Sequence, residues 1–194
     1  MKEFFKKYSY TMVKLFVNQF AIALFGVGLA FVSGYSESNT MKIVTGIGSI
    51  VFYLFLLYAH MWEIGAKDGI SAVARETSRG LWRGFAIGLG ANSINLLLAL
   101  FILPGAFAPL GSTLDGMSAA FSVIALLLEG MYIGILSLPL GGIALNQYAW
   151  VYFAITVPAI VVCGVAYIFG SFNLHATNIL IPKNKDVKNN GRPR

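Results

Sequence analysis

Five long apolar stretches alternate with short polar segments along the chain. A helix rises about 1.5 Å per residue, so about 20 apolar residues are enough to cross a hydrocarbon core of about 30 Å. Four of the stretches have this length and carry few charges. The pattern therefore predicts an all-α membrane protein with four transmembrane helices, at about 9–33, 42–64, 84–103 and 148–170.

The fifth apolar stretch, 118–140, differs from the others because Glu129 lies at its middle. A carboxylate at the centre of a span is unfavourable by roughly 2.5–3.5 kcal/mol on insertion scales. At helical spacing its polar residues and an alanine gather on one side, which indicates an amphipathic segment. We predict a re-entrant or interfacial helix here, and the alternative is a fifth transmembrane helix. The predicted polar side holds Ser118, Ser122, Ala125, Glu129 and Tyr132.

The Lys and Arg residues decide the orientation, because cytoplasmic loops of membrane proteins carry the excess of positive charge. Lys2, Lys6 and Lys7 precede the first span, and the charged segment 62–83 separates the second span from the third. Both regions are predicted to be cytoplasmic. The C-terminus is then cytoplasmic if 118–140 does not cross the membrane, and external if it does.

Composition supports a location in the cell membrane. The chain is 57% hydrophobic and 11% charged, whereas about a quarter of the residues in a soluble domain are charged. No long polar linker divides it, so we expect one multi-pass domain over 1–182, followed by a disordered basic tail at 183–194. The net charge of +6 is explained by cations that flank the spans, and no nucleic acid partner is expected. The expected partners are the lipid bilayer and another membrane protein or a second copy of this chain.

The charged segment 62–83 has a helical pattern of its own. Asp68 is placed to cap a short amphipathic helix from residue 69 to about 79, with Gly80 as its stop, in the plane of the cytoplasmic surface. Arg75, Arg79 and Arg83 then form a row at spacings of four residues. This row fits anionic lipid or an acidic partner, or it serves only as a positive-inside anchor.

Polar residues inside the spans are the candidates for function. Lys14 and Asn18 share one face of the first span, and Asn92 and Asn95 share a face of the third with small residues. Small residues let helices approach closely, and amides in lipid need partners, so this face is predicted to be buried. With Glu129, these residues are interpreted either as helix-packing groups or as the lining of a polar pathway.

The sequence contains little other recognisable chemistry. His60 and Glu63 are one helical turn apart, but a zinc site needs three or four protein ligands, and the only other histidine is His175 near the C-terminus. Glu63 is expected to pair with Lys67 instead. Glycine-rich phosphate loops, nucleophile elbows and paired catalytic carboxylates are missing from the sequence. We predict no metal, no cofactor and no catalytic residues.

Three classes of function remain open. The chain is interpreted first as an accessory or assembly subunit of a larger membrane complex. The alternative is a small oligomeric transporter or channel that uses the intramembrane polar groups. The third is a lipid-facing enzyme with His60 and Glu63 in its site. The sequence names neither a substrate nor a partner.

Overall fold

The computed structural model describes residues 2–35 and 38–174, which are mainly helical. Three long helices are joined by shorter ones and by one small hairpin of two antiparallel strands. The helices are α1 (Lys2–Tyr35), α2 (Asn39–Ala74), α3 (Arg83–Ala91), α4 (Ser93–Ile102), η1 (Leu103–Phe107), α5 (Thr113–Leu128), η2 (Gly130–Tyr132), α6 (Ile133–Leu136), η3 (Leu145–Gln147) and α7 (Ala149–Ser171), and the strands are β1 (Pro139–Leu140) and β2 (Ile143–Ala144).

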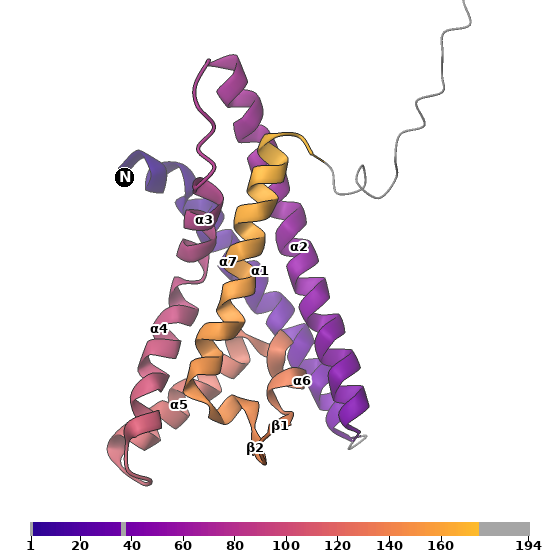
Figure 1. Ribbon diagram of the computed structural model, residues 1–194, viewed down its shortest axis with the longest axis vertical. Coiled ribbons are helices and arrows are strands. Elements are labelled where there is room, and N and C mark those ends of the chain that lie inside the picture. Colours follow the sequence, from indigo (N-terminus) through magenta and orange to yellow (C-terminus); the bar gives the residue numbers. More distant parts are fainter. Residues whose placement is uncertain (1, 36–37, 175–194) are drawn as a thin grey trace, which may run out of the picture.

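The helices form a bundle in which α7 packs against α2, α3 and α4 (Figure 1). We call its two ends the upper and lower ends, as Figure 1 shows them. The upper end carries the start of α1 and the ends of α2 and α7, and the lower end carries the hairpin. Three helices, α1, α2 and α7, are long and apolar enough to cross a membrane. The number rises to five if each of two bent pairs counts as one span.

The first bent pair replaces the uninterrupted span expected at 84–103. The helix breaks at Asn92, where the axis of α3 and that of the segment Ser93–Phe107 differ by 54°. The Asn92 side chain donates from Nδ2 to the Gly88 carbonyl oxygen at 2.9 Å. Asparagine side chains compete with the backbone for hydrogen bonds in this way, which disfavours a regular helix. The small-residue face is nevertheless buried as predicted, with Asn92 and Asn95 both inside the bundle.

The second bent pair contains the stretch 118–140. Helix α5 ends at Leu128, and the chain turns by 88° at Glu129 into η2 and α6. Figure 1 shows that α5 starts at the lower end of the bundle and that α6 leads back to the hairpin at the same end. Between these points Gly130 lies against the Ala23 carbonyl in the middle of α1. The bend of this pair therefore lies against the middle of α1.

The amphipathic pattern of 118–140 is largely confirmed. Ser118, Ala125, Glu129 and Tyr132 are buried, and Ser122 is half-buried. The buried side packs against α1, α2 and α4. On the opposite side Ile124 and Leu127 are exposed, whereas Met131, which lies beyond the bend, is buried.

The separate helix predicted at 69–79 is wrong. Helix α2 continues through Lys67 and Asp68 to Ala74, and residues 77–80 are irregular. It ends in a Schellman motif, in which the Thr77 amide bonds the Ala72 carbonyl at 2.9 Å and Glu76 has a φ of 53°. Consequently the three arginines do not form a helical row, because Arg75 ends α2, Arg79 lies in the irregular segment and Arg83 begins α3.

Glycines hold α2 against α7 at the upper end. A Cβ atom on Gly65 would lie 2.2 Å from the Tyr167 carbonyl oxygen, and one on Gly69 would lie 2.3 Å from that of Ser171. On the other helix, a Cβ atom on Gly170 would lie 2.0 Å from the Trp62 carbonyl oxygen. Only glycine permits backbones to approach this closely. The contact fixes the height of α2 relative to α7 and so places Asp68 beside Tyr167.

Candidate functional site

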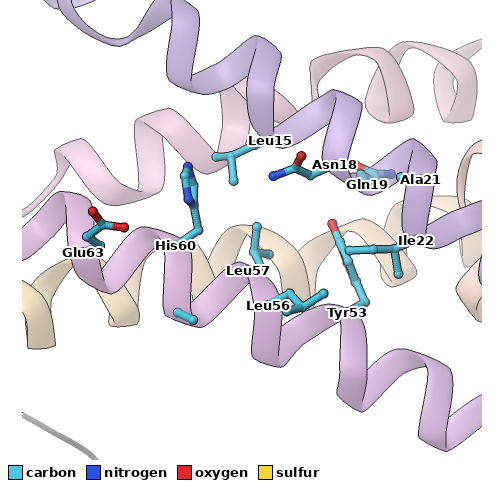
Figure 2. Close-up of a pocket in the computed structure, with 11 residues that line it drawn as sticks. Leu15, Asn18, Gln19, Ala21, Ile22, Tyr53, Leu56, Leu57, His60 and Glu63 are labelled. Carbon is cyan, nitrogen blue, oxygen red and sulfur yellow. The ribbon is translucent and has the colours of Figure 1, made fainter.

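A cleft of about 480 Å³ lies between α1 and α2. Figure 2 shows Leu15 and Asn18 of α1 pointing into it from one side, and Leu57 and His60 of α2 from the other. Its lining mixes apolar and polar side chains. The polar members are Asn18, Gln19, Tyr53, His60 and Glu63.

The cleft brings together residues that the sequence analysis treated separately. Asn18 belongs to the polar face predicted on α1, and His60 and Glu63 belong to the pair on α2. Lys14 is exposed and close enough to His60 and Glu63 to interact electrostatically with both. The predicted pairing of Glu63 with Lys67 is confirmed, with Nζ 2.6 Å from Oε1.

The inner end of the cleft reaches the break after α5. Tyr53 and Glu63 are separated by about 15 Å along α2, so the cleft extends deep into the bundle. At that depth Gln19 is 3% exposed and donates from Nε2 to the Leu128 carbonyl oxygen at 3.3 Å. Leu128 directly precedes Glu129. The amide of Gln19 therefore connects the cleft to the backbone beside the buried carboxyl group.

Glu129 is 3% exposed and lies where the chain turns between α5 and η2. Its Oε1 is 3.2 Å from the hydroxyl oxygen of Thr156, which is itself 2.9 Å from the Tyr152 carbonyl oxygen. Within residues 2–35 and 38–174, neither of the two ion pairs involves Glu129. Among these residues, the carboxyl group thus has no ion-pair partner and a hydrogen-bond contact with one hydroxyl group.

Further hydroxyl groups are buried where η2 packs on α2. The hydroxyls of Tyr132 in η2 and Ser49 in α2 are buried, and neither has a protein hydrogen-bond partner in the described part of the chain. Tyr132 is close enough to Glu129 for the two groups to interact electrostatically. An unpaired buried hydroxyl is unfavourable, so these groups are available to a ligand.

The asparagine pair forms a separate feature. Asn95 donates from Nδ2 to Asn92 Oδ1 at 3.2 Å, and Asn92 in turn donates to Gly88. Neither residue lines the cleft or bonds to Glu129. The five predicted pathway or packing residues therefore occupy three places. Lys14 and Asn18 lie at the cleft, and Asn92 and Asn95 lie at the break between α3 and α4. Glu129 lies at the turn between α5 and η2, in contact with Thr156 of α7.

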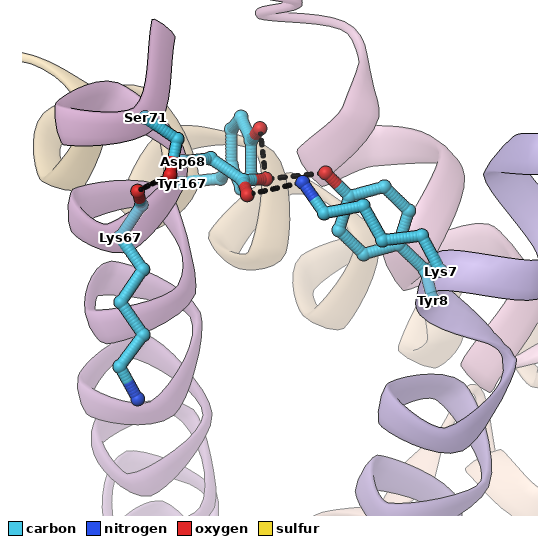
Figure 3. Close-up of polar contacts among 6 residues, drawn as sticks. All are labelled: Lys7, Tyr8, Lys67, Asp68, Ser71 and Tyr167. Carbon is cyan, nitrogen blue, oxygen red and sulfur yellow. Dashed lines mark hydrogen bonds and ion pairs between the residues drawn. The ribbon is translucent and has the colours of Figure 1, made fainter. Parts of the chain in front are cut away.

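A second carboxylate lies at the upper end, where the sequence analysis expected only a helix cap. Asp68 accepts hydrogen bonds from Lys7 Nζ at 2.6 Å, from Tyr167 Oη at 2.7 Å and from Tyr8 Oη (Figure 3). It lies beyond the apolar part of α2. Burial by itself would raise the pKa of the Asp68 carboxyl, but these hydrogen bonds hold the pKa below its ordinary value. Asp68 therefore joins the ends of α1, α2 and α7.

The three arginines separate around this cluster. Arg75 and Arg83 line a pocket of about 410 Å³ together with Lys7 and Asp68. Arg79 lies elsewhere, with its guanidinium carbon 4.5 Å from the centre of the Phe172 ring.

The described residues contain no group of three or more His, Cys, Asp or Glu side chains that could hold a metal ion. His175 and the basic tail at 183–194 lie outside the described residues. The chain matches no protein-family model, no curated protein and no solved structure.

Proposed function

We propose that the protein is an integral membrane protein with four spans, formed by α1, α2, the bent pair α3 and α4, and α7, and with α5, η2 and α6 as a re-entrant segment. The length and hydropathy of the helices support the spans. The start and end of 113–136 at one end of the bundle support the re-entrant path. The cations near the start of α1 and the end of α2 favour a cytoplasmic upper end.

Cysteine labelling tests this topology. In a Cys163→Ala background, Leu110→Cys precedes the re-entrant segment and Leu140→Cys follows it, and both positions are exposed. Both should react with a membrane-impermeant maleimide from the same, external side of intact cells. Ser78→Cys serves as the cytoplasmic control and should react only after permeabilisation. Labelling of Leu110→Cys and Leu140→Cys from opposite sides would establish a fifth span.

Within this topology we propose that the protein transports a proton or a small monovalent cation and that Glu129 binds it. The observation that carries the proposal is the buried carboxyl group at an 88° break of the chain, which forms no ion pair with any described residue. Ionisable groups inside a membrane are unfavourable and mark ion pathways, and broken helices are tolerated where they are buried or line a cavity.

The geometry around Thr156 favours a proton or cation on Glu129. The Thr156 hydroxyl has one proton but two oxygen neighbours, Glu129 Oε1 and the Tyr152 carbonyl. If Thr156 donates to Tyr152, the contact with an ionised Glu129 would place two acceptors together. A protonated Glu129 removes this conflict because it donates to Thr156. A bound cation also removes the conflict, because it coordinates Oε1 of Glu129 and the hydroxyl oxygen of Thr156.

The cleft between α1 and α2 supplies the route of entry. Its polar lining extends from Glu63 inward to Gln19 and Tyr53, beside the break that carries Glu129. Polar side chains at this depth favour water in the cleft, since lipid cannot satisfy their hydrogen bonds. In the proposed orientation, the cation enters from the cytoplasmic side and reaches Glu129 through the inner end of the cleft.

Flux measurements in proteoliposomes test the transport proposal. Vesicles containing the purified protein should dissipate an imposed proton or sodium gradient faster than protein-free vesicles, measured with a pH-sensitive dye and with radioactive sodium. Glu129→Gln should lower the rate at least tenfold, because the glutamine amide does not titrate and has no negative charge to neutralise a bound cation.

Glu76→Gln is the matched control, because Glu76 is an exposed carboxylate beyond the end of α2 and does not line the cleft. We expect its rate to stay within about a factor of two of wild type, since screening by solvent weakens an exposed charge. Equal rates in wild type and Glu129→Gln, or no flux of either cation through folded wild-type protein, would refute the proposal.

A role as an accessory or assembly subunit is the second candidate, and the exposure of the cleft favours it. Lys14 and Asn18 are exposed in the isolated chain, although polar groups facing lipid are unfavourable. A helix of a partner membrane protein would cover them. Mild detergent extraction should then recover a second protein in stoichiometric amount, and Asn18→Leu should weaken its retention. Recovery of this chain alone would contradict the subunit role.

A further inference from the structure

The pocket beside the Asp68 cluster is distinct from the cleft that leads to Glu129. It lies at the upper end of the bundle, between the start of α1, the end of α2 and the start of α3. Its volume is about 410 Å³, and five of its lining residues are charged. The charged residues are Glu3, Lys7, Asp68, Arg75 and Arg83.

The cations of this pocket outnumber the carboxylates that are free to neutralise them. Asp68 is engaged by Lys7 and two tyrosine hydroxyls. Neither Arg75 nor Arg83 takes part in an ion pair within the described residues. Both arginines line the pocket, and guanidinium groups suit a phosphate group because each offers several hydrogen-bond donors in a fixed plane.

The hydroxyls of Tyr8 and Tyr167 support one of these guanidinium groups. Both tyrosines interact with Arg83, and both also donate to Asp68. Arg83 is therefore positioned by the same cluster that joins the ends of α1, α2 and α7. Arg75, in contrast, is an exposed residue at the end of α2.

The surface around the pocket is apolar and aromatic. Trp82 is 57% exposed, and its ring centre is 5.2 Å from that of Phe4, which also lines the pocket. Phe5, which follows Phe4 in α1, is 51% exposed. Aromatic rings beside basic residues are typical of the membrane interface, where a lipid presents both a phosphate and its acyl chains. This combination favours a lipid over a free phosphate ion.

We infer that Arg75 and Arg83, with Lys7 beside them, form a binding site for the phosphate of an anionic phospholipid, while the acyl chains lie along Trp82 and Phe5. The sequence pattern predicts such a role for three arginines in a row. In the folded chain Arg79 packs on Phe172 and does not line the pocket. Lys7, from the N-terminal part of α1, lines it instead. The site is independent of Glu129 and of the transport proposal.

Lipid titration of the purified full-length protein tests the site. The variant Arg75→Gln/Arg83→Gln is compared with Lys67→Gln/Arg79→Gln, which removes the same number of positive charges from the same end of the bundle. Short-chain phosphatidylglycerol, phosphatidylcholine and inorganic phosphate are titrated separately in neutral detergent, with binding followed by tryptophan fluorescence. Native mass spectrometry of the same samples counts the lipids that stay bound.

Wild type and the control variant should bind phosphatidylglycerol at least tenfold more tightly than phosphatidylcholine, with little response to inorganic phosphate. The test variant should lose this preference. Arg75→Gln alone changes an exposed residue outside the bundle interior, so it should fold normally and still bind phosphatidylglycerol severalfold more weakly. Equal binding of both lipids by wild type, equal loss in the control variant, unchanged affinity in Arg75→Gln, or inorganic phosphate binding as tightly as the lipid would each overturn the inference.

Discussion

Asp68 and Glu129 are carboxylates held inside the same helix bundle, but their surroundings differ. Asp68 has three hydrogen-bond donors, one of them the ammonium group of Lys7. It lies within a continuous helix, at a height set by the glycine contacts of α2 with α7. Glu129 has one hydroxyl in hydrogen-bond contact, no ion-pair partner among the described residues, and a backbone that turns by 88° at its own position.

The difference separates structural from functional use of a buried charge. A carboxylate that is fully hydrogen-bonded and paired joins elements together, and losing it loosens the bundle. A carboxyl group with unfilled bonding capacity has no such structural explanation and is suited to accept a transient ligand. Asp68 fits the first description and Glu129 the second. We therefore expect loss of the Asp68 carboxylate to affect mainly stability, and conservative substitution of Glu129 to affect mainly transport.

The largest effect is expected for Glu129→Lys. The substitution places an ammonium group where the structure provides no carboxylate, and an uncompensated buried charge destabilises by about 3–5 kcal/mol. We expect little monodisperse protein and a strongly lowered midpoint of thermal unfolding, measured by tryptophan fluorescence. Glu129→Gln keeps the shape and the bond to Thr156 and should unfold within a few degrees of wild type. A large loss of stability in Glu129→Gln would indicate a structural role like that of Asp68.

Asp68→Ala is expected to be the next in size and to affect stability more than flux. It removes a charged acceptor from Lys7, Tyr8 and Tyr167, and hydrogen bonds to charged groups are worth about 1.5–3 kcal/mol. Because Lys7 remains solvated, we expect a net loss of about 2–3 kcal/mol in the free energy of unfolding, measured by denaturant titration in detergent. The flux per folded molecule should stay near that of wild type. A stable Asp68→Ala protein with abolished flux would reverse the comparison.

The sequence predicted the apolar helices well, because long apolar stretches leave the backbone few alternatives in lipid. The stretches at 9–33 and 42–64 lie within single helices, and α7 covers the stretch at 148–170 except for its first residue. Glu129 was recognised as exceptional by composition alone. Helical spacing also placed Tyr132 on the side of Glu129. Gln19 and Thr156 come from α1 and α7, and their approach to Glu129 depends on tertiary packing that periodicity does not reveal.

The errors near the upper end have a common physical origin. Gly69 and Asp68 were interpreted as the start of a new helix, since glycine and aspartate often mark helix ends. In the folded chain α7 packs so closely against Gly69 that only glycine fits there. Asp68 accepts hydrogen bonds from Lys7 and two tyrosines. The spacing of Gly65 and Gly69 was the signal for a close helix contact. The true end of α2 at Ala74 is followed by Glu76, a left-handed residue other than glycine, which sequence patterns rarely predict.

A smaller effect is expected for Thr156→Val, which tests the contact between α7 and Glu129. The substitution keeps the volume of the side chain and removes its hydroxyl, whose bonds to Glu129 and Tyr152 are replaced by apolar contact. A single buried hydrogen bond contributes about 1 kcal/mol, so the free energy of unfolding should fall by about that amount. The proton or sodium flux should fall severalfold, less than in Glu129→Gln. Unchanged flux in a folded Thr156→Val protein would show that Glu129 acts without this neighbour.

The smallest effect is expected for Lys7→Met, which removes the cation of the Asp68 cluster but keeps most of the length of the side chain. The Lys7 side chain is 53% exposed, and solvent-exposed ion pairs contribute about 0–1 kcal/mol. The two tyrosine donors remain, so Asp68 stays hydrogen-bonded, and we expect a loss below about 1 kcal/mol in the free energy of unfolding, reduced further by high salt. The matched control is Lys67→Met, which breaks the exposed pair with Glu63. If Lys7→Met destabilised the protein as much as Asp68→Ala, the ammonium group would hold the three helices together, and the tyrosines would be secondary to it.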